Sequence, residues 1–305
     1  MTAPSQKSVA GPLHLRLPAT SANLGPGFDT LGLAMALYLA IDATPADSFH
    51  IDATGRDADL CACLEDNLIL TTYIDVLANA GRMAPPLHLQ LHNEIPLGMG
   101  CGSSAAALVA GVLLASHFGN LSWTSQQVLE EAFRREGHPD NVAACFLGGM
   151  TVSAISKNGL FTATCGENLD WNLLLALPSS SLATQKARAL LPSSYSREDA
   201  VANIQSTALL VAAFSQGRGD LLRTAMQDRL HQPYRMEACP LLPLLLPLAE
   251  TPGVLGVALS GAGPSVLLIV AGGEGPRLPE LIRKAAGDPA LEVIQTAIAK
   301  GASYS

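Results

Sequence analysis

The chain has few of the features that mark membrane, secreted or nucleic-acid-binding proteins. Although 49 % of its 305 residues are apolar, no run approaches the roughly 20 consecutive apolar residues that cross a bilayer. Lys and Arg number 18 against 26 Asp and Glu, without a basic cluster that would bind nucleic acid. Residues 1–11 contain one lysine and no apolar core, so we expect a disordered tail and no signal peptide. We therefore expect a cytoplasmic protein with neither a membrane nor a nucleic-acid partner.

Cysteine is scarce and follows no metal-binding pattern. The chain has six, and Cys61 and Cys63 are separated by one residue, whereas zinc sites use a longer gap and a second pair. Without an export signal, free buried thiols are expected.

Glycine, in contrast, is concentrated in one stretch. Residues 96–107 are Pro-Leu-Gly-Met-Gly-Cys-Gly-Ser-Ser-Ala-Ala-Ala, with three glycines at alternate positions. The alternation of apolar and polar residues over 87–92 predicts a strand before it, and residues 105–118 predict a buried helix after it. Glycines let successive N–H groups face one anion at a helix N-terminus. We predict a phosphate-binding loop that matches neither the Walker A nor the dinucleotide motif; a glycine-rich turn without a ligand is the alternative.

Two further segments carry short polar side chains in turn-rich sequence. Residues 18–29 (Pro-Ala-Thr-Ser-Ala-Asn-Leu-Gly-Pro-Gly-Phe-Asp) predict a loop, in which Asn23 and Asp29 either grip a small polar molecule or only cap turns. Residues 136–144 (Glu-Gly-His-Pro-Asp-Asn-Val-Ala-Ala) predict a polar corner that opens a helix at Pro139.

Elsewhere strands and helices alternate in mixed order, which favours an α+β fold over a doubly wound parallel sheet. We predict helices at 67–82, 124–136, 184–191, 196–216 and 279–286, and strands at 14–17, 31–43, 49–53, 151–155, 160–164, 173–177, 254–259, 266–270 and 291–294. Strand 49–53 is the expected partner of 31–43, and Asp66 the expected cap of the first helix. A core stripe is expected at Val201, Ile204, Ala208 and Val211. A composition shift over 165–171 predicts a domain boundary.

A resemblance to the GHMP kinases, named for galactokinase, homoserine kinase, mevalonate kinase and phosphomevalonate kinase, rests on four segments in order: 18–29, 96–106, 136–143 and 259–265. The first and third are most similar to the homoserine kinase branch. The resemblance implies a two-domain GHMP kinase fold. Residues 12–165 would form an N-terminal ATP-binding domain like domain 2 of ribosomal protein S5, and residues 166–305 a ferredoxin-like α/β sandwich. Cys101 stands where the family loop usually has Leu or Met, and we expect only an altered packing contact there.

The same resemblance implies ATP-dependent phosphorylation of the side-chain hydroxyl of L-homoserine to O-phospho-L-homoserine, on the route to threonine. The family pattern assigns ATP to one residue before a helix and to the glycine-rich loop: Asn67, Pro96, Leu97, Gly98, Met99, Gly100, Cys101, Gly102, Ser103 and Ser104. Ser104 and Glu136 would hold Mg²⁺, because a hydroxyl and a carboxylate are hard oxygen ligands. Glu136 could instead be a solvated carboxylate at a helix end.

The pattern assigns the amino acid to residues from both domains: Asn23, Asp29, Asp140, Thr184, Arg188, Arg235, Gly261 and Gly263. Aspartates suit the ammonium of a zwitterion, and arginines suit its carboxylate. Asn141 would orient the acceptor hydroxyl, so the implied catalytic set is Asn141, Glu136 and Ser104, without a general base. Arg188 could instead lie on a solvated helix face, and Arg235 on the surface.

Two other functions stay open: a GHMP kinase of another small alcohol, such as mevalonate or a sugar, and a non-catalytic relative that binds a metabolite. Two arginines with two aspartates favour an amino-acid substrate. The presence of Glu136, Ser104 and the loop glycines speaks against a non-catalytic protein. We expect a homodimer whose only ligands are small molecules.

Overall fold

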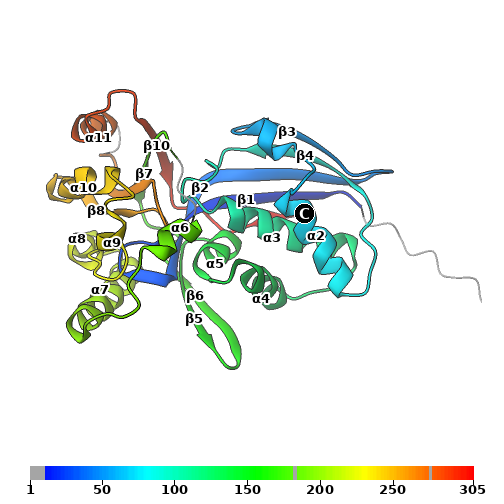
Figure 1. The fold of residues 1–305 in the computed structure, drawn as a ribbon, viewed down its shortest axis with the longest axis horizontal. Coiled ribbons are helices and arrows are strands. Elements are labelled where there is room, and N and C mark those ends of the chain that lie inside the picture. The colour runs from blue at the N-terminus through cyan, green and yellow to red at the C-terminus, as the bar shows by residue number, and fades with distance from the viewer. Residues whose placement is uncertain (1–10, 181–183, 275–276) are drawn as a thin grey trace, which may run out of the picture.

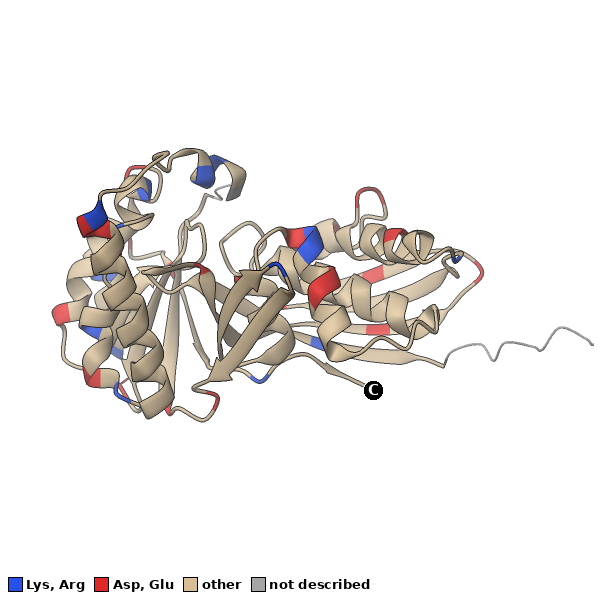
Figure 2. Ribbon diagram, turned by 90° about the horizontal axis from the view of Figure 1, so that it is seen from below, with Lys and Arg blue, Asp and Glu red and all other residues tan. Residues whose placement is uncertain are grey.

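The computed structural model describes residues 11–180, 184–274 and 277–305, with only the backbone of Thr184. The predicted tail therefore lies outside the described residues, except for Gly11. The chain forms two halves that lie side by side along the long axis, each a β-sheet covered by helices (Figure 1). This confirms the α+β prediction. Across the described ranges, none of the helices is both long and apolar enough to span a membrane. Acidic and basic residues are interspersed over both halves (Figure 2).

The first half is built on a seven-stranded sheet with the path β11-β1-β2-β4-β3, and the β5–β6 hairpin pairs with β2. Its strands are β1 (Leu13–Asn23), β2 (Gly27–Pro45), β3 (His50–Gly55), β4 (Leu87–Asn93), β5 (Met150–Ser156), β6 (Gly159–Cys165) and β11 (Ser303–Tyr304). Only β3 and β4 pair in parallel; the other pairs are antiparallel.

Helices cover one face of this sheet: α1 (Ala58–Cys61), α2 (Leu68–Asn79), α3 (Ser103–Phe118), α4 (Ser125–Glu136) and α5 (Asp140–Leu147). The helices pack on one face because side chains along each strand alternate between the two faces of the sheet, and the apolar ones lie on the same face. In β4, Leu87, Leu89 and Leu91 are buried, whereas the polar residues between them are more exposed. The central helix α3 is apolar or small on nearly every side, and it lies under the sheet with α2 and α4 beside it.

The second half is built on a four-stranded antiparallel sheet in the order β10-β7-β9-β8. Its strands are β7 (Trp171–Leu177), β8 (Val254–Leu259), β9 (Val266–Ala271) and β10 (Glu292–Ala297). Its helices are α6 (Thr184–Ala189), α7 (Arg197–Gln216), η1 (Gly219–Leu221), α8 (Leu222–Ala225), α9 (Gln232–Arg235), α10 (Leu241–Leu245), η2 (Leu246–Glu250) and α11 (Leu278–Ala286). The chain order β7-α7-β8-β9-α11-β10 with this strand order is the ferredoxin-like arrangement that we predicted.

Two predictions about strands are wrong. Residues 18–23 continue β1 and are not a loop, because their backbone pairs with β2 after a register shift between Pro18 and Ala19. Strand β3 pairs with β4 and not with β2. The chain end also returns to the first sheet, through bridges at Ile298 and Lys300 and the pairing of β11 with β1.

Three predictions about side chains are also wrong. The cap of α2 is Asn67, whose Oδ1 accepts hydrogen bonds from two backbone N–H groups, and not Asp66. Most of the predicted core stripe of α7 faces solvent: Val201 is 47 % and Ile204 67 % exposed, Ala208 is exposed, and Val211 alone of the four packs against the core. Cys63 is exposed, although Cys101, Cys145 and Cys239 are buried as expected.

The tip of the β1–β2 hairpin joins the two halves. It reaches into the second half, where Asn203 Nδ2 and Thr207 Oγ1 of α7 donate hydrogen bonds to the Pro26 carbonyl at 2.6 and 2.9 Å. His231 Nε2 lies 2.6 Å from the Gly25 carbonyl oxygen. Gly25 itself has φ +86°, and a Cβ there would lie 2.3 Å from the Met226 carbonyl oxygen. The tip is therefore fixed by its backbone, at a point with no room for a side chain.

This fit can be tested with a pair of glycine substitutions. Gly81 also has a positive φ, of +68°, but no atom lies within 4 Å of a Cβ built there. Gly81→Ala should therefore cost only the left-handed backbone penalty of about 1–2 kcal/mol. Gly25→Ala adds a backbone clash, and we expect it to lower the free energy of unfolding by on the order of 3 kcal/mol or more in urea titrations. Equal losses in the two variants would show that the hairpin tip is not tightly held.

Candidate active site

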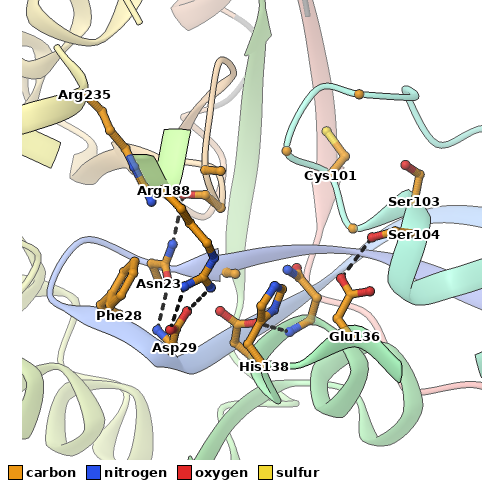
Figure 3. Close-up of a pocket in the computed structure, with 18 residues that line it drawn as sticks. Asn23, Phe28, Asp29, Cys101, Ser103, Ser104, Glu136, His138, Arg188 and Arg235 are labelled. Atoms are coloured by element: carbon orange, nitrogen blue, oxygen red, sulfur yellow. Dashed lines mark hydrogen bonds and ion pairs between the residues drawn. The ribbon is translucent and has the colours of Figure 1, made fainter. Parts of the chain in front are cut away.

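A cavity of about 200 Å³ lies where the hairpin tip, the glycine-rich loop and the second half meet. It is lined by Ala22, Asn23, Phe28, Asp29, Gly98, Gly100, Cys101, Gly102, Ser103, Ser104, Glu136, His138, Asp140, Asn141, Arg188, Arg235, Gly261 and Ala262 (Figure 3). Most of the predicted site residues are thus brought together from six separate stretches of sequence. Ala22, Phe28 and His138 were not predicted as site residues, although all three lie in the segments that carry the resemblance.

The glycine-rich loop presents backbone groups to this cavity. Gly98, Gly100 and Gly102 have φ of 69°, 72° and 69°, and positive φ at every second residue turns successive N–H groups towards one side. A Cβ would lie 2.2 Å from the Ser260 carbonyl oxygen at Gly100 and 1.8 Å from Thr20 Oγ1 at Gly102. Helix α3 begins directly after the loop, at Ser103. The loop N–H groups and the positive end of the α3 dipole together form an anion site.

Cys101 belongs to the core beneath the loop. It is 1 % exposed and packs in the larger hydrophobic cluster, which contains residues of both halves. Its carbonyl oxygen accepts a hydrogen bond from Thr20 N at 3.0 Å, which ties the loop to β1. Burial raises the pKa of the thiol to about 12, so it is neutral and unreactive at neutral pH.

Ser104 and Glu136 place two oxygen groups beside the loop. Ser104 lies in the first turn of α3, and its Oγ donates a hydrogen bond of 2.9 Å to Glu136 Oε1 at the end of α4 (Figure 3). Burial raises the pKa of Glu136, against the opposing effects of His138 and the Ser104 hydrogen bond. Within the described ranges, Glu136 forms no ion pair with a lysine or arginine. A half-buried carboxylate that pairs with no described lysine or arginine, next to a hydroxyl and an anion site, fits a hard divalent ion.

Asp29 and Arg188 form an ion pair across the cavity. Two guanidinium nitrogens of Arg188 donate to the two carboxylate oxygens of Asp29, at 3.0 and 2.5 Å (Figure 3). Asn23 Oδ1 accepts from the Asp29 backbone N–H at 3.1 Å, and its Nδ2 donates to the Gly261 carbonyl at 2.9 Å. Asn23 therefore holds Asp29 as well as linking β1 to the 260–265 loop. Arg188 faces the cavity and not bulk solvent as a helix-surface residue would.

Arg235 is a buried cation at the same cavity. It is 1 % exposed, so the alternative of a surface residue is wrong. Its Nε donates to the Ala187 carbonyl at 3.2 Å, but no carboxylate of the described ranges forms an ion pair with it. Burial and the nearby Arg188 lower its pKa. The ring centroid of Phe28 lies 5.3 Å from Cζ of Arg188 and 5.6 Å from Cζ of Arg235, within cation–π range of both. A buried charge is costly without a counter-ion, so this site is built for an anion.

His231 positions Arg235, and the sequence analysis missed it. Burial lowers its pKa, which keeps the imidazole neutral. With Nε2–H donating to the Gly25 carbonyl, Nδ1 is free to accept from Arg235 at 3.1 Å. One imidazole thus connects the hairpin tip to the buried cation. The only sequence signal is its spacing, one helical turn before Arg235.

Asp140 and Asn141 open α5 at the floor of the cavity. Asp140 is 2 % exposed and accepts from the Asn141 backbone N–H at 2.8 Å. His138 Nδ1 lies 3.2 Å from the Asp140 carboxylate, which raises the pKa of His138. Asn141 Oδ1 accepts a hydrogen bond from Thr20 Oγ1 at 2.7 Å, so its Nδ2 is the group left to donate. Thr20 is a further residue that the sequence did not indicate as part of the site.

A second cavity, of about 330 Å³, adjoins the first at Ser103 and Ser104. Asn67 and Leu97 line it with apolar residues of α2, but Pro96, Met99 and Gly263 line neither cavity. Both ends of the Asn67 side-chain amide are hydrogen-bonded within the protein. Oδ1 caps α2, and Nδ2 donates to the Cys61 and Cys63 carbonyls at 3.2 and 3.0 Å. Thr184 begins α6, but its side chain lies outside the described residues.

Comparison with known proteins agrees with this geometry. Residues 67–149 match the model of the GHMP kinases N terminal domain, and residues 210–288 match the GHMP kinases C terminal model. The homoserine kinase of Solibacter usitatus is 50 % identical over 84 % of this chain and 84 % of its own length. That of Deinococcus radiodurans is 43 % identical over 85 % of each chain. The crystal structure of homoserine kinase from Cytophaga hutchinsonii superposes with a TM-score of 0.82 at 25 % identity and covers both chains completely.

The raised pKa of Glu136 predicts a gain of stability when its charge is removed. At neutral pH the ionised carboxylate costs folding free energy, and this cost disappears as pH falls through its raised pKa towards the ordinary carboxyl value. Glu136→Gln keeps an acceptor for Ser104, so in urea titrations its unfolding free energy should equal or exceed that of the native protein at pH 7.5, with the difference shrinking at lower pH. The control is Glu131→Gln, which removes a buried carboxylate from its ion pairs with Arg134 and Arg135 in the same helix and should destabilise at pH 7.5. Equal destabilisation by both variants would contradict the prediction.

Proposed function

Because this chain belongs to the GHMP kinase superfamily, on its homoserine kinase branch, we propose that it phosphorylates the side-chain hydroxyl of L-homoserine with ATP. The product would be O-phospho-L-homoserine, on the route to threonine. The observation that carries the proposal is the buried guanidinium of Arg235, which pairs with no carboxylate of the described ranges and faces a cavity that also holds buried Asp140. An amino acid supplies both the carboxylate and the ammonium that such a cavity requires. Mevalonate would supply only a carboxylate, and a sugar neither.

The nucleotide would bind across the two adjoining cavities. Backbone N–H groups of Gly98 to Ser104 and the α3 N-terminus suit the triphosphate. The apolar second cavity shares Ser103 and Ser104 with the first, so a base attached to that triphosphate would reach it. Asn67 then acts as a positioning residue, because its hydrogen bonds tie α2 to the Cys61–Cys63 wall of that cavity.

Ser104 and Glu136 would hold Mg²⁺ beside the phosphates, as hard oxygen donors 2.9 Å apart. A bound magnesium ion neutralises charge on the phosphoryl group being transferred. Glu136 is suited to this task because burial leaves its charge poorly compensated.

The ammonium and the carboxylate of the amino acid would bind beside the Asp29–Arg188 ion pair. Its carboxylate would lie between Arg188 and Arg235, and its ammonium between Asp29 and Asp140. Opposite charges then alternate around the site, and each buried ion is compensated. Asn23 keeps Asp29 in place through its backbone N–H.

The acceptor hydroxyl would be oriented by Asn141. Since Thr20 occupies Oδ1, the amide Nδ2 donates to the hydroxyl oxygen and aims a lone pair at the γ-phosphate. An amide cannot take the proton, and Asp140 is engaged with the substrate ammonium, so the hydroxyl proton would leave to the transferred phosphoryl group or to solvent. The residues thus contribute alignment and charge compensation, which are the main demands of phosphoryl transfer.

The substrate assignment is tested by acceptor specificity. Homoserine should far exceed serine in kcat/KM, because serine lacks the methylene that carries the hydroxyl to the phosphate while both charges stay clamped. A misplacement of about 1 Å costs on the order of 100-fold. The assay measures ADP release with homoserine, serine, threonine, mevalonate and galactose, and identifies O-phosphohomoserine by ³¹P NMR. A comparable kcat/KM for mevalonate would refute the assignment.

Arg235→Met tests the carboxylate site. Loss of a desolvated partner costs roughly 2–5 kcal/mol, so the KM for homoserine should rise at least about 30-fold, with the KM for ATP nearly unchanged. The free energy of unfolding should not fall as the KM for homoserine rises, because the variant removes a buried and unpaired charge. Arg223→Met, in an exposed ion pair with Glu250, is the matched control and should leave both KM values unchanged. A selective rise in the KM for ATP would instead place Arg235 in the nucleotide site.

A further inference from the structure

The outer face of the first sheet carries a cluster of imidazole and carboxylate groups, away from the active site. On the face opposite the helices, edge strand β3 contributes His50 and Asp52, and its parallel neighbour β4 contributes His88. His50 and His88 are directly opposite each other in the strand register. Asp52 follows His50 by two residues and therefore lies on the same face of the sheet.

The three side chains converge on one point. One carboxylate oxygen of Asp52 lies 3.1 Å from His50 Nε2, and the other lies 2.8 Å from His88 Nε2. The two imidazole rings are 5.0 Å apart, and one ligand atom from each residue lies within 4.8 Å of the others. In the register, Thr44 lies opposite His88, and Gln90 lies opposite Asp52. Both neighbours are neutral, so neither competes as a cation for the carboxylate.

We propose that His50, Asp52 and His88 form a binding site for a divalent transition-metal ion of the zinc class, with water completing its coordination. Two imidazoles and one carboxylate are ligands that Zn²⁺, Ni²⁺ and Cu²⁺ prefer, whereas Mg²⁺ takes oxygen ligands almost exclusively. The cross-strand positions of the histidines provide a chelate whose backbone is already ordered by the sheet. Only the exposed side chains must adjust to close on an ion.

The bound ion would stabilise the pairing of β3 with β4 at the edge of the sheet. Among the strands that the structure describes, β3 pairs with β4 alone, and a metal bound by residues of both strands would link them a second time. β3 also leads into α1, whose Leu60 and Cys61 line the second cavity. We therefore assign the metal a structural role in joining β3 to β4. This proposal does not rest on the proposed kinase activity.

The test measures Zn²⁺ binding to the full chain after chelator treatment and dialysis. Calorimetry should detect one Zn²⁺ ion that raises the thermal unfolding midpoint, and Co²⁺ in the same site should give visible d–d absorption. His50→Ala, His88→Ala and Asp52→Asn should each weaken Zn²⁺ binding by at least about tenfold and abolish both the midpoint shift and the Co²⁺ bands. All three residues are exposed or half-buried, so the variants should fold.

Two controls make the result specific. His14→Ala removes an imidazole that is paired with Asp42 on the same sheet but has no second histidine, and it should bind Zn²⁺ as the native chain does. Glu136→Gln removes the other oxygen site that could take a divalent ion. Zn²⁺ binding that survives His88→Ala but is lost in Glu136→Gln would place the metal beside the glycine-rich loop and overturn the proposal. Absence of Zn²⁺ binding to the native chain would overturn it too, leaving the cluster as a surface ion-pair network.

Discussion

The contact between the β1–β2 hairpin tip and the second half is the constraint on which the rest of the structure depends. Two side chains of α7 and the buried His231 bind the carbonyl groups of Pro26 and Gly25. Buried backbone groups must be paired, so the tip can sit in only one place. Because Asn23 and Asp29 flank the tip, this placement also fixes one wall of the active site. The same few hydrogen bonds therefore hold the hairpin tip against the second half and place one wall of the site.

The charged side chains of the site are unequally compensated by their neighbours. Arg188 is compensated by Asp29, but Arg235 is held only by neutral groups: a carbonyl oxygen, the His231 imidazole and the Phe28 ring. On the other side of the cavity, half-buried Glu136 is held by a neutral hydroxyl. Each end of the site thus has one charge that the described part of the chain leaves to a ligand. This imbalance costs stability, and it is the physical basis of the affinities that we propose, for a phosphate–metal complex at one end and a carboxylate at the other.

The glycine-rich loop packs closely against neighbouring backbone and at the same time directs its N–H groups at the cavity. Gly100 and Gly102 lie against Ser260 and Thr20, so that β1, the loop and the 260–265 turn are in backbone contact. Because Gly100 and Gly102 themselves carry no side chains, this close approach is possible and the loop N–H groups stay directed at the cavity. Thr20 extends the contact to Asn141 through its hydroxyl, which links the proposed nucleotide side of the cavity to the proposed acceptor side.

The sequence by itself determined the family, the α+β class and most of the elements, because these follow from local patterns: alternating leucines in β4, the Thr124 cap of α4 and the glycine spacing of the loop. It also predicted, mainly through four short segments, most of the residues that line the candidate cavity. It could not determine which apolar stripe of α7 is buried, since Val201 and Ile204 repeat with helical spacing whether or not a partner element lies over them. It likewise assigned residues 18–23 to a loop, because turn-forming residue types outweigh strand pairing when the partner strand is unknown.

Tertiary structure alone decided which polar groups would be compensated. That Arg188 pairs with Asp29 whereas Arg235 rests on His231 depends on residues up to 206 positions apart in the chain. The same holds for Thr20 and Asn141, and for the three groups gathered on β3 and β4. Residue type states what chemistry a side chain is capable of. The burial and partners that turn this capacity into a binding site arise only when distant segments pack together, because desolvation and electrostatics depend on distance in space and not on separation along the chain.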